Sequence, residues 1–342
     1  MWWLTCCTII WIHEYGCEVT EMSMETADEF DTAEERAAQF ESETEKHRTE
    51  LETLIHHFRH DMIGLVSLVL LGFILAVTLL GPVIIPKDPI AQNYDAIRAS
   101  PGGEFFFGTD HLGRDVLSRM VLGGRYSIAI GFTSILIAST LGILIGGVAA
   151  YTSREWLDET LMRGMDIIIS FPAIVMGIAV MGIFGDGTIE IGPVAITNFW
   201  KLVIIIGVIY TPRFARVTRG AVLQEKGKSY VLMSRIEGAS HRYVFLREIF
   251  PNVLSPLLVL ITYRIGSAMI LAAALSFLGI GIQSPTPSWG NMLADSRDLI
   301  FIGVWWVTVF PAIALATTIV CLNILGDSIR DALDPDVSII ES

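Results

Sequence analysis

The chain has 342 residues, of which 52% are hydrophobic and only 17% are charged, and its mean hydropathy is +0.57. Average globular proteins carry about a quarter charged residues, so this composition excludes an ordinary soluble domain and indicates an integral membrane protein. The formal net charge of −13 is unevenly placed, because fifteen acidic and four basic side chains precede Ile63, against twenty-one and nineteen after it.

The segment 1–62 is predicted to be an acidic cytoplasmic tail without chemistry of its own. Its first 20 residues are apolar, but they lack the basic start and the small-residue cleavage site of a signal peptide. An upstream start site explains them at least as well, with the natural first residue at Met22 or Met24. The three cysteines of this segment fit no usual zinc spacing, so we expect no metal site.

Residues 63–325 alternate long apolar segments with polar loops, which predicts an all-α integral membrane protein. A helix rises ~1.5 Å per residue and the hydrocarbon core is ~30 Å thick, so about 20 apolar residues can cross it. Six segments are predicted to do so, and the fourth is the weakest by hydropathy. The six are Ile63–Ile85, Ser127–Tyr151, Met165–Phe184, Asn198–Val217, Val253–Gly279 and Leu299–Leu325.

Two of these segments carry packing signals. The second is rich in small residues at four-residue spacing, which lets helix backbones approach closely and predicts a helix inside the bundle. Its small residues include Gly131, Ser134, Ser139, Gly142, Gly146 and Gly147. The third contains Ser170-Phe171-Pro172, which predicts a proline kink within a single span.

The distribution of basic residues predicts the orientation. The loop 219–252 is long and basic, so the positive-inside rule places it in the cytoplasm. With six spans, both termini are then cytoplasmic, including a C-terminal tail 326–342. Cytoplasmic segments hold fifteen Lys and Arg and extracytoplasmic segments six, although the outer segment 87–124 with the adjoining Arg125 holds five of those six.

The loop 219–252 has a pattern of its own. Between Tyr230 and Phe250 apolar residues recur near a helical period, and Gly238 interrupts them. This pattern predicts two short helices around a tight glycine turn, lying on the membrane face and presented to a soluble partner.

Four motifs, in this order, carry a family resemblance that covers roughly residues 63–335. They are Gly108–Arg119, Tyr230–Ser240 with Ile249–Asn252, Leu275–Gly281 with Trp289–Gly290, and Leu325–Pro335. The chain resembles permease subunits of ABC importers, and most closely those of the dipeptide, oligopeptide and nickel branch. Met233 and Ser234 depart from the family pattern, because they stand where it has two alanines.

The resemblance implies a non-catalytic permease of the inner membrane that forms the path for peptides or a related small solute. The implied partners are a homologous second permease, two ABC ATPase subunits, an extracytoplasmic substrate-binding protein and the lipid bilayer, with no nucleic acid. The residues implied to couple the chain to an ATPase are Tyr230, Val231, Arg235, Gly238, Ala239, Ser240 and Pro251. Whether the solute is a dipeptide, a longer peptide or a nickel chelate stays open.

The energy source is predicted to lie on other chains. Gly227-Lys228-Ser229 resembles the end of a phosphate-binding loop, but Val222 stands where its first glycine is required. We therefore expect this chain to bind no cofactor and separate subunits to hydrolyse ATP. The alternative is a secondary carrier or channel without ATPase partners, although neither an inverted repeat nor a midplane ion pair is visible. A membrane-bound enzyme is a weaker alternative, because the sequence shows no recognisable group of catalytic residues.

Arg264 lies deep in the fifth predicted span, where a charge costs at least ~2.5 kcal/mol on insertion scales. It either lines the translocation path and meets a substrate carboxylate, or contacts the partner permease, or snorkels through polar groups of the bundle.

Asp110, Arg114, Asp115 and Arg119 form a second dense group of charges, before the second span. Nothing near them supplies a nucleophile or a metal, so a salt-bridged structural corner is the better interpretation than a catalytic carboxylate pair.

Overall fold

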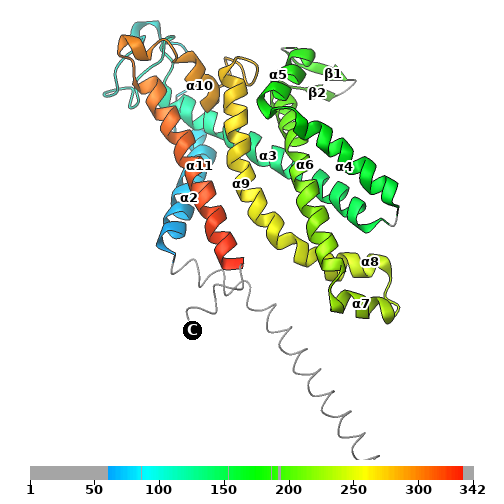
Figure 1. The fold of residues 1–342 in the computed structure, drawn as a ribbon. Coiled ribbons are helices and arrows are strands. Elements are labelled where there is room, and N and C mark those ends of the chain that lie inside the picture. The colour runs from blue at the N-terminus through cyan, green and yellow to red at the C-terminus, as the bar shows by residue number, and fades with distance from the viewer. Residues whose placement is uncertain (1–60, 86, 153, 186, 192–193, 334–342) are drawn as a thin grey trace, which may run out of the picture. The chain divides into compact units, whose positions relative to one another are not determined.

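The computed structural model describes residues 61–333, except for residues 86, 153, 186 and 192–193. The predictions made for the first 60 residues and for residues 334–342 lie outside these described residues. In chain order the elements are α2 (Met62–Ile84), the short η1 (Tyr94–Ala96), α3 (Val116–Tyr151), α4 (Glu155–Ser170), α5 (Ala173–Phe184), β1 (Ile189–Ile191), β2 (Val194–Ile196), α6 (Asn198–Lys226), α7 (Ser229–Ile236), α8 (His241–Tyr243), the π-helical turn η2 (Val244–Ile249), α9 (Phe250–Phe277), α10 (Trp289–Asp295), η3 (Ile300–Ile302) and α11 (Trp306–Leu333). Figure 1 shows α11 running alongside both α2 and α9.

Four helices of the described chain are long and apolar enough to cross a membrane, or five if one bent pair is a single span. The four lie at Met62–Gly81, Val116–Tyr151, His241–Phe277 and Trp306–Ala332. They correspond to the predicted first, second, fifth and sixth spans. Helix α6 coincides with the predicted fourth span but is not among them, and it carries Lys201, Arg213 and Arg216 along its length.

The predicted third span is not one kinked helix. Helices α4 and α5 meet at an angle of 91° on either side of Phe171 and Pro172. Proline has no N–H to donate, and it disfavours helical backbone in the residue before it. Phe171 accordingly has an extended backbone, with ψ at 135°. The kink expected from Pro172 is therefore a break between two helices.

Other boundaries also differ from the prediction. Helix α3 begins at Val116 rather than near Ser127, because the Asp115 carboxylate accepts the N–H of Ser118 and caps its first turn at 2.8 Å. The expectation of an all-α chain is wrong between α5 and α6, where β1 and β2 pair as a small antiparallel hairpin. Alternating isoleucine and valine residues favour this extended backbone.

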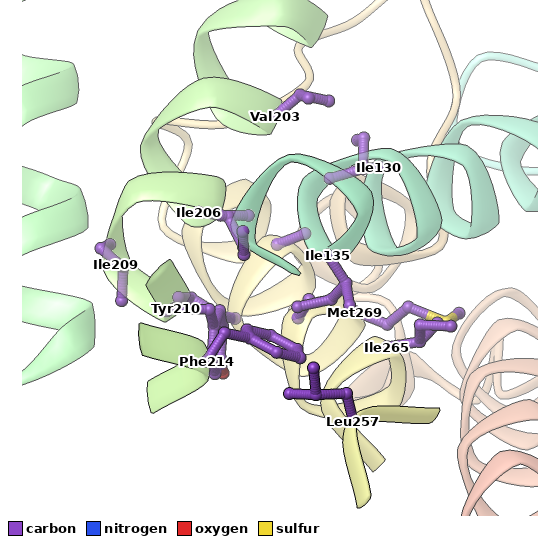
Figure 2. Packing of buried hydrophobic residues seen from close by; sticks show 14 of the residues in the cluster. Ile130, Ile135, Val203, Ile206, Ile209, Tyr210, Phe214, Leu257, Ile265 and Met269 are labelled. Atoms are coloured by element: carbon purple, nitrogen blue, oxygen red, sulfur yellow. The ribbon is translucent and has the colours of Figure 1, made fainter. Parts of the chain in front are cut away.

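Helices α3, α6 and α9 supply most of the buried hydrophobic core of the described residues (Figure 2). Glycines of α3 face the neighbouring backbones: an added Cβ at Gly142 would lie 2.3 Å from the Cβ of Phe214, and one at Gly146 would lie 2.3 Å from the carbonyl oxygen of Ala215. Gly131 faces Met269 of α9 in the same way. The prediction that α3 packs inside the bundle through its small residues is confirmed.

The predicted salt-bridged corner before α3 is also confirmed. The Arg114 Nε lies 2.6 Å from the Asp110 carboxylate, and the Arg119 Nε lies 3.6 Å from it. Arg114 and Arg119 also lie 3.5 and 3.8 Å from the carboxylate of Asp295 in α10, a partner that the sequence did not reveal. These charges join α10 to the start of α3 and the segment before it.

The start of α2 and the end of α11 are joined as well. The Asp61 carboxylate accepts the N–H groups of Ile63 and Gly64, and it accepts the Ser328 hydroxyl at 2.5 Å. The first and last described helices therefore have these two ends on the same side of the bundle.

Candidate coupling site

The segment between α6 and α9 has a sharp turn followed by a long continuous helix. Helix α7 ends at Ile236, and Gly238 adopts a positive φ of 88°, a conformation that L side chains rarely adopt. Ser240 then restarts the helix, since its hydroxyl accepts the Tyr243 N–H at 3.3 Å. The predicted second short helix is not separate, because the chain runs through η2 into α9 as one helix, His241–Phe277.

Pro251 explains the irregular turn in that continuous helix. It lies in the first turn of α9, directly after the π-helical turn η2. Because proline lacks an N–H and crowds the preceding turn, a regular α-helical ladder cannot pass through it unchanged. The wider turn accommodates Pro251, and the helix continues without a second break.

The inner face of the segment is anchored in the core. Val231 of α7 and Val244 and Ile249 of η2 are fully buried, with 0% of their surface exposed. Ala239, beside the glycine turn, is half-buried and packs against the same core. Full burial of an aliphatic side chain stabilises by about 1.5–3 kcal/mol, so this face is held firmly against the spans.

Tyr230 adds a polar anchor. Its hydroxyl donates to the Glu225 carboxylate at 2.7 Å and accepts from the Asn252 amide at 3.0 Å, so it joins the end of α6 to the start of α9. Lys228 pairs with the same Glu225 at 2.6 Å. Burial and the adjacent Glu225 carboxylate raise the pKa of the Tyr230 phenol far above its ordinary value. The phenol therefore keeps its proton and remains a donor.

Tyr151, the last residue of α3, holds the segment from the other side. Its hydroxyl donates to the His241 carbonyl at 2.8 Å, and its ring packs edge-on against Phe245 with centroids 5.2 Å apart. The Lys226 ammonium lies 5.3 Å and the Arg235 guanidinium 5.9 Å from the centre of the same ring. Burial of the Lys226 ammonium lowers its pKa, and the positive charge of Arg235 lowers it further. Tyr151 therefore contacts the end of α6 and three parts of the segment, in α7, α8 and η2.

The outer face of α7 is apolar and exposed. Leu232, Met233 and Ile236 are 48%, 58% and 80% exposed, and Leu246 of η2 is also exposed. Apolar side chains gathered on an exposed helix face, with basic residues around them, are typical of a protein contact surface. Met233, which replaces an alanine of the family pattern, lies on this outer face.

The structure brings together all seven residues predicted for coupling, in the segment from α7 to the first turn of α9. Arg264 lies elsewhere, in the middle of α9, with Tyr210 and Arg213 of α6 as its electrostatic neighbours. Tyr151, Glu225 and Asn252 were not among the residues predicted for coupling. An acidic residue in a strongly basic loop was a signal for Glu225, and Asn252 lies within the matched motif.

Residues 142–339 match the model of the binding-protein-dependent transport system inner membrane component. The chain belongs to this family. Residues 52–101 match the N-terminal TM domain of oligopeptide transport permease C.

Curated relatives agree with this assignment. The permease is 37% identical, over 81% of its length and 89% of the relative's, to the di/tripeptide transport system permease protein DppC of Pseudomonas aeruginosa. It is 36% identical, over 85% and 92%, to the glutathione transport system permease protein GsiD of Escherichia coli O157:H7. The predicted resemblance to peptide-branch ABC importer permeases is confirmed.

The fold agrees as well. The permease resembles an inward-facing structure of the MetNI methionine ABC transporter with a TM-score of 0.51 and 18% identity. The likeness covers 63% of the permease and 97% of the chain in that structure. At this identity it shows the fold alone. Together these findings describe a multi-pass permease subunit of the inner membrane component family.

Proposed function

We propose that this permease forms the translocation path of an ABC importer for peptides or a related small solute, and that separate subunits hydrolyse the ATP. The observation that carries the proposal is the two-faced coupling segment. Its inner face is buried through Val231, Val244 and Ile249, and its outer face exposes Leu232, Met233 and Ile236. A force applied to the outer face would reach the spans as rigid-body motion, because packed interiors deform little.

The proposed topology has six spans. The bent pair α4 and α5 counts as one, and α6 as another, alongside the four apolar helices. Two observations support cytoplasmic termini: the basic loop 219–252 follows the fourth span, and the start of α2 lies beside the end of α11 through Asp61 and Ser328. An even number of spans returns the chain to the side on which it began.

The proposed partners follow from the same surface. The chain offers one coupling segment, in which Tyr230, Val231, Arg235, Gly238, Ala239, Ser240 and Pro251 position the docking face. Two ATPases would therefore need a homologous second permease with a segment of its own. An extracytoplasmic binding protein would deliver the solute to the opposite end, and the lipid bilayer would cover the apolar spans.

Site-directed photo-cross-linking tests the docking role. A single cysteine is placed at Ile236 after the native cysteines are replaced, the thiol is labelled with benzophenone maleimide, which inserts into C–H bonds of a neighbouring chain on illumination, and the complex is purified through a tag on the permease. We expect Ile236→Cys to cross-link to a subunit that an azido-ATP probe labels. The matched control is Phe301→Cys, because Phe301 is equally apolar and 85% exposed but lies beside α11's outer end.

The same preparation separates the two function classes. ATP-dependent uptake of dialanine into proteoliposomes, together with the Ile236 cross-link, supports the importer. A complex that lacks any ATP-labelled subunit and takes up solute on an ion gradient alone would make the permease a secondary carrier, and the proposal would be wrong.

A further inference from the structure

Two arginines from different helices lie near Tyr210 and are electrostatic neighbours of each other. Arg213 of α6 lies with its guanidinium carbon 5.8 Å from the ring centre of Tyr210, and Arg264 of α9 is an electrostatic neighbour of both residues. Tyr210 belongs to the packed core of α3, α6 and α9, where Figure 2 shows it beside Phe214. The Arg213 side chain is exposed on the described chain, and Arg264 is partly buried.

The depth of the two side chains is similar. Arg213 follows the first residue of α6 by fifteen positions, and Arg264 precedes the last residue of α9 by thirteen. At ~1.5 Å per residue, both lie roughly 20 Å from the extracytoplasmic ends of their helices. This depth is well inside a hydrocarbon core of ~30 Å.

The charges of this pair are not compensated by an acid within the part of the chain that the structure describes. The next arginines along α6 differ: Arg216 pairs with Asp166 at 2.5 Å, and Arg219 pairs with Asp158 at 2.6 Å. Among the described residues, Arg213 and Arg264 form no ion pair, and the Nε of Arg264 is buried without a hydrogen-bond partner. An arginine cannot lose its proton to escape this environment.

Two like charges at this depth repel each other unless an anion lies between or beside them. The cation–π contact with Tyr210 orients the Arg213 guanidinium but adds no negative charge. Guanidinium groups present parallel N–H donors that match the two oxygens of a carboxylate. The arrangement is therefore suited to a carboxylate that arrives from outside the chain.

We propose that Arg213 and Arg264 together bind the carboxylate of the transported solute within the translocation path, with the Tyr210 ring positioning Arg213. This inference rests on the proposed function and deepens it. The two arginines would select solutes with a free carboxylate, such as a peptide with an unblocked C-terminus. An acidic side chain of the second permease is the other source of a carboxylate, and the experiment distinguishes the two.

Arginine modification by phenylglyoxal tests the site directly on the purified complex. The modification rates of Arg213 and Arg264 are measured by mass spectrometry with no addition, with millimolar dialanine, or with millimolar dialanine amide. We expect dialanine to slow modification of both arginines at least threefold and the amide to leave it unchanged. Arg163, exposed and paired with Glu159 on α4, serves as the internal control and should react equally in all three.

Variants identify the source of the carboxylate. Arg264→Ala should abolish the protection of Arg213, whereas Arg264→Lys, which keeps the charge, should retain part of it. Complex yield should stay within twofold of wild type. If Arg264→Ala instead lowers the yield of intact complex, the pair contacts the partner permease and the proposal is overturned. Equal protection by dialanine and its amide, or protection by neither, also overturns it.

The outcome is separable from that of the proposed function, because the modification assay needs no transport. Failure of ATP-driven uptake in the wild-type complex would count against the importer and leave the protection result standing. Conversely, uptake of dialanine by Arg264→Ala at the wild-type rate would remove the carboxylate site while the importer stands.

Discussion

The hydroxyl of Tyr151 donates to the carbonyl of His241 at 2.8 Å, so the last residue of α3 is bound to the first residue of α8. Helix α3 is also the helix that α6 and α9 pack against through its glycines. A displacement of the coupling segment would therefore pass to the centre of the bundle through one short link, as well as along α9.

Replacing Tyr151 with phenylalanine should weaken this link. The ring contact with Phe245 is kept, while a hydrogen bond worth about 0.5–1.5 kcal/mol is lost. We expect solute uptake per ATP hydrolysed in proteoliposomes to fall about twofold or more, with the amount of assembled complex unchanged. Tyr94→Phe is the control, since Tyr94 is 71% exposed in the outer segment. Unchanged stoichiometry in Tyr151→Phe would show that this link does not carry motion.

Replacing Gly238 with valine should distort the turn after α7. A side chain there meets nothing within 4 Å, so the penalty comes from the positive φ alone and is about 1–2 kcal/mol. We expect uptake and stimulated ATP hydrolysis both to fall while membrane insertion persists. Asparagine tolerates this backbone, so Gly238→Asn should retain most activity. Equal loss in the two variants would point to a requirement other than backbone conformation.

Replacing Gly146 with leucine should separate α3 from α6. Its Cβ would lie 2.3 Å from the Ala215 carbonyl oxygen, and overpacking of this kind costs typically ~1–3 kcal/mol. We expect a lower melting temperature of the detergent-purified permease and a smaller monodisperse fraction on size exclusion. Gly164→Leu is the control, because nothing lies within 4 Å of a Cβ at that position. A wild-type melting temperature for Gly146→Leu would contradict the close approach.

Replacing Asp295 with asparagine should loosen the salt-bridged corner. Arg114 and Arg119, each with a side chain 2% exposed, would keep only Asp110 as a close acid. Asp295 is itself 29% exposed, so we expect a loss of about 1–3 kcal/mol, below that of a fully buried pair. Thermal unfolding of the purified permease measures it, and Asp298→Asn, an exposed acid on the same segment, should have no effect.

Local patterns in the sequence predicted those features whose determinants lie close together along the chain. The Asp110–Arg114 pair spans four positions, and the glycine turn at Gly238 depends on one residue. Asp295 completes the corner from 181 positions away, and no local pattern contains that information. The place of Arg213 beside Arg264 was missed for the same reason.

Two other features of the structure differ from the prediction, although their causes lie close together in the sequence. In both places the local sequence is compatible with more than one structure. A proline within an apolar segment is compatible with a kink or a break, and packing of α4 on α6 through Asp158 and Arg219 accompanies the break at Pro172. Four of the six residues in strands β1 and β2 are β-branched, but so short a run does not stand out beside the spans. The residues predicted for coupling could be proposed from the sequence because their motif is dense and continuous.

The corner built by Arg114 and Asp295 also sets an order of events during synthesis. At about 5–20 residues per second, the ribosome adds Asp295 roughly ten to forty seconds after Arg114. Throughout that interval two guanidiniums share the single carboxylate of Asp110. A chain released before α10 is made keeps that imbalance, so the corner can close only after α10 has been synthesised.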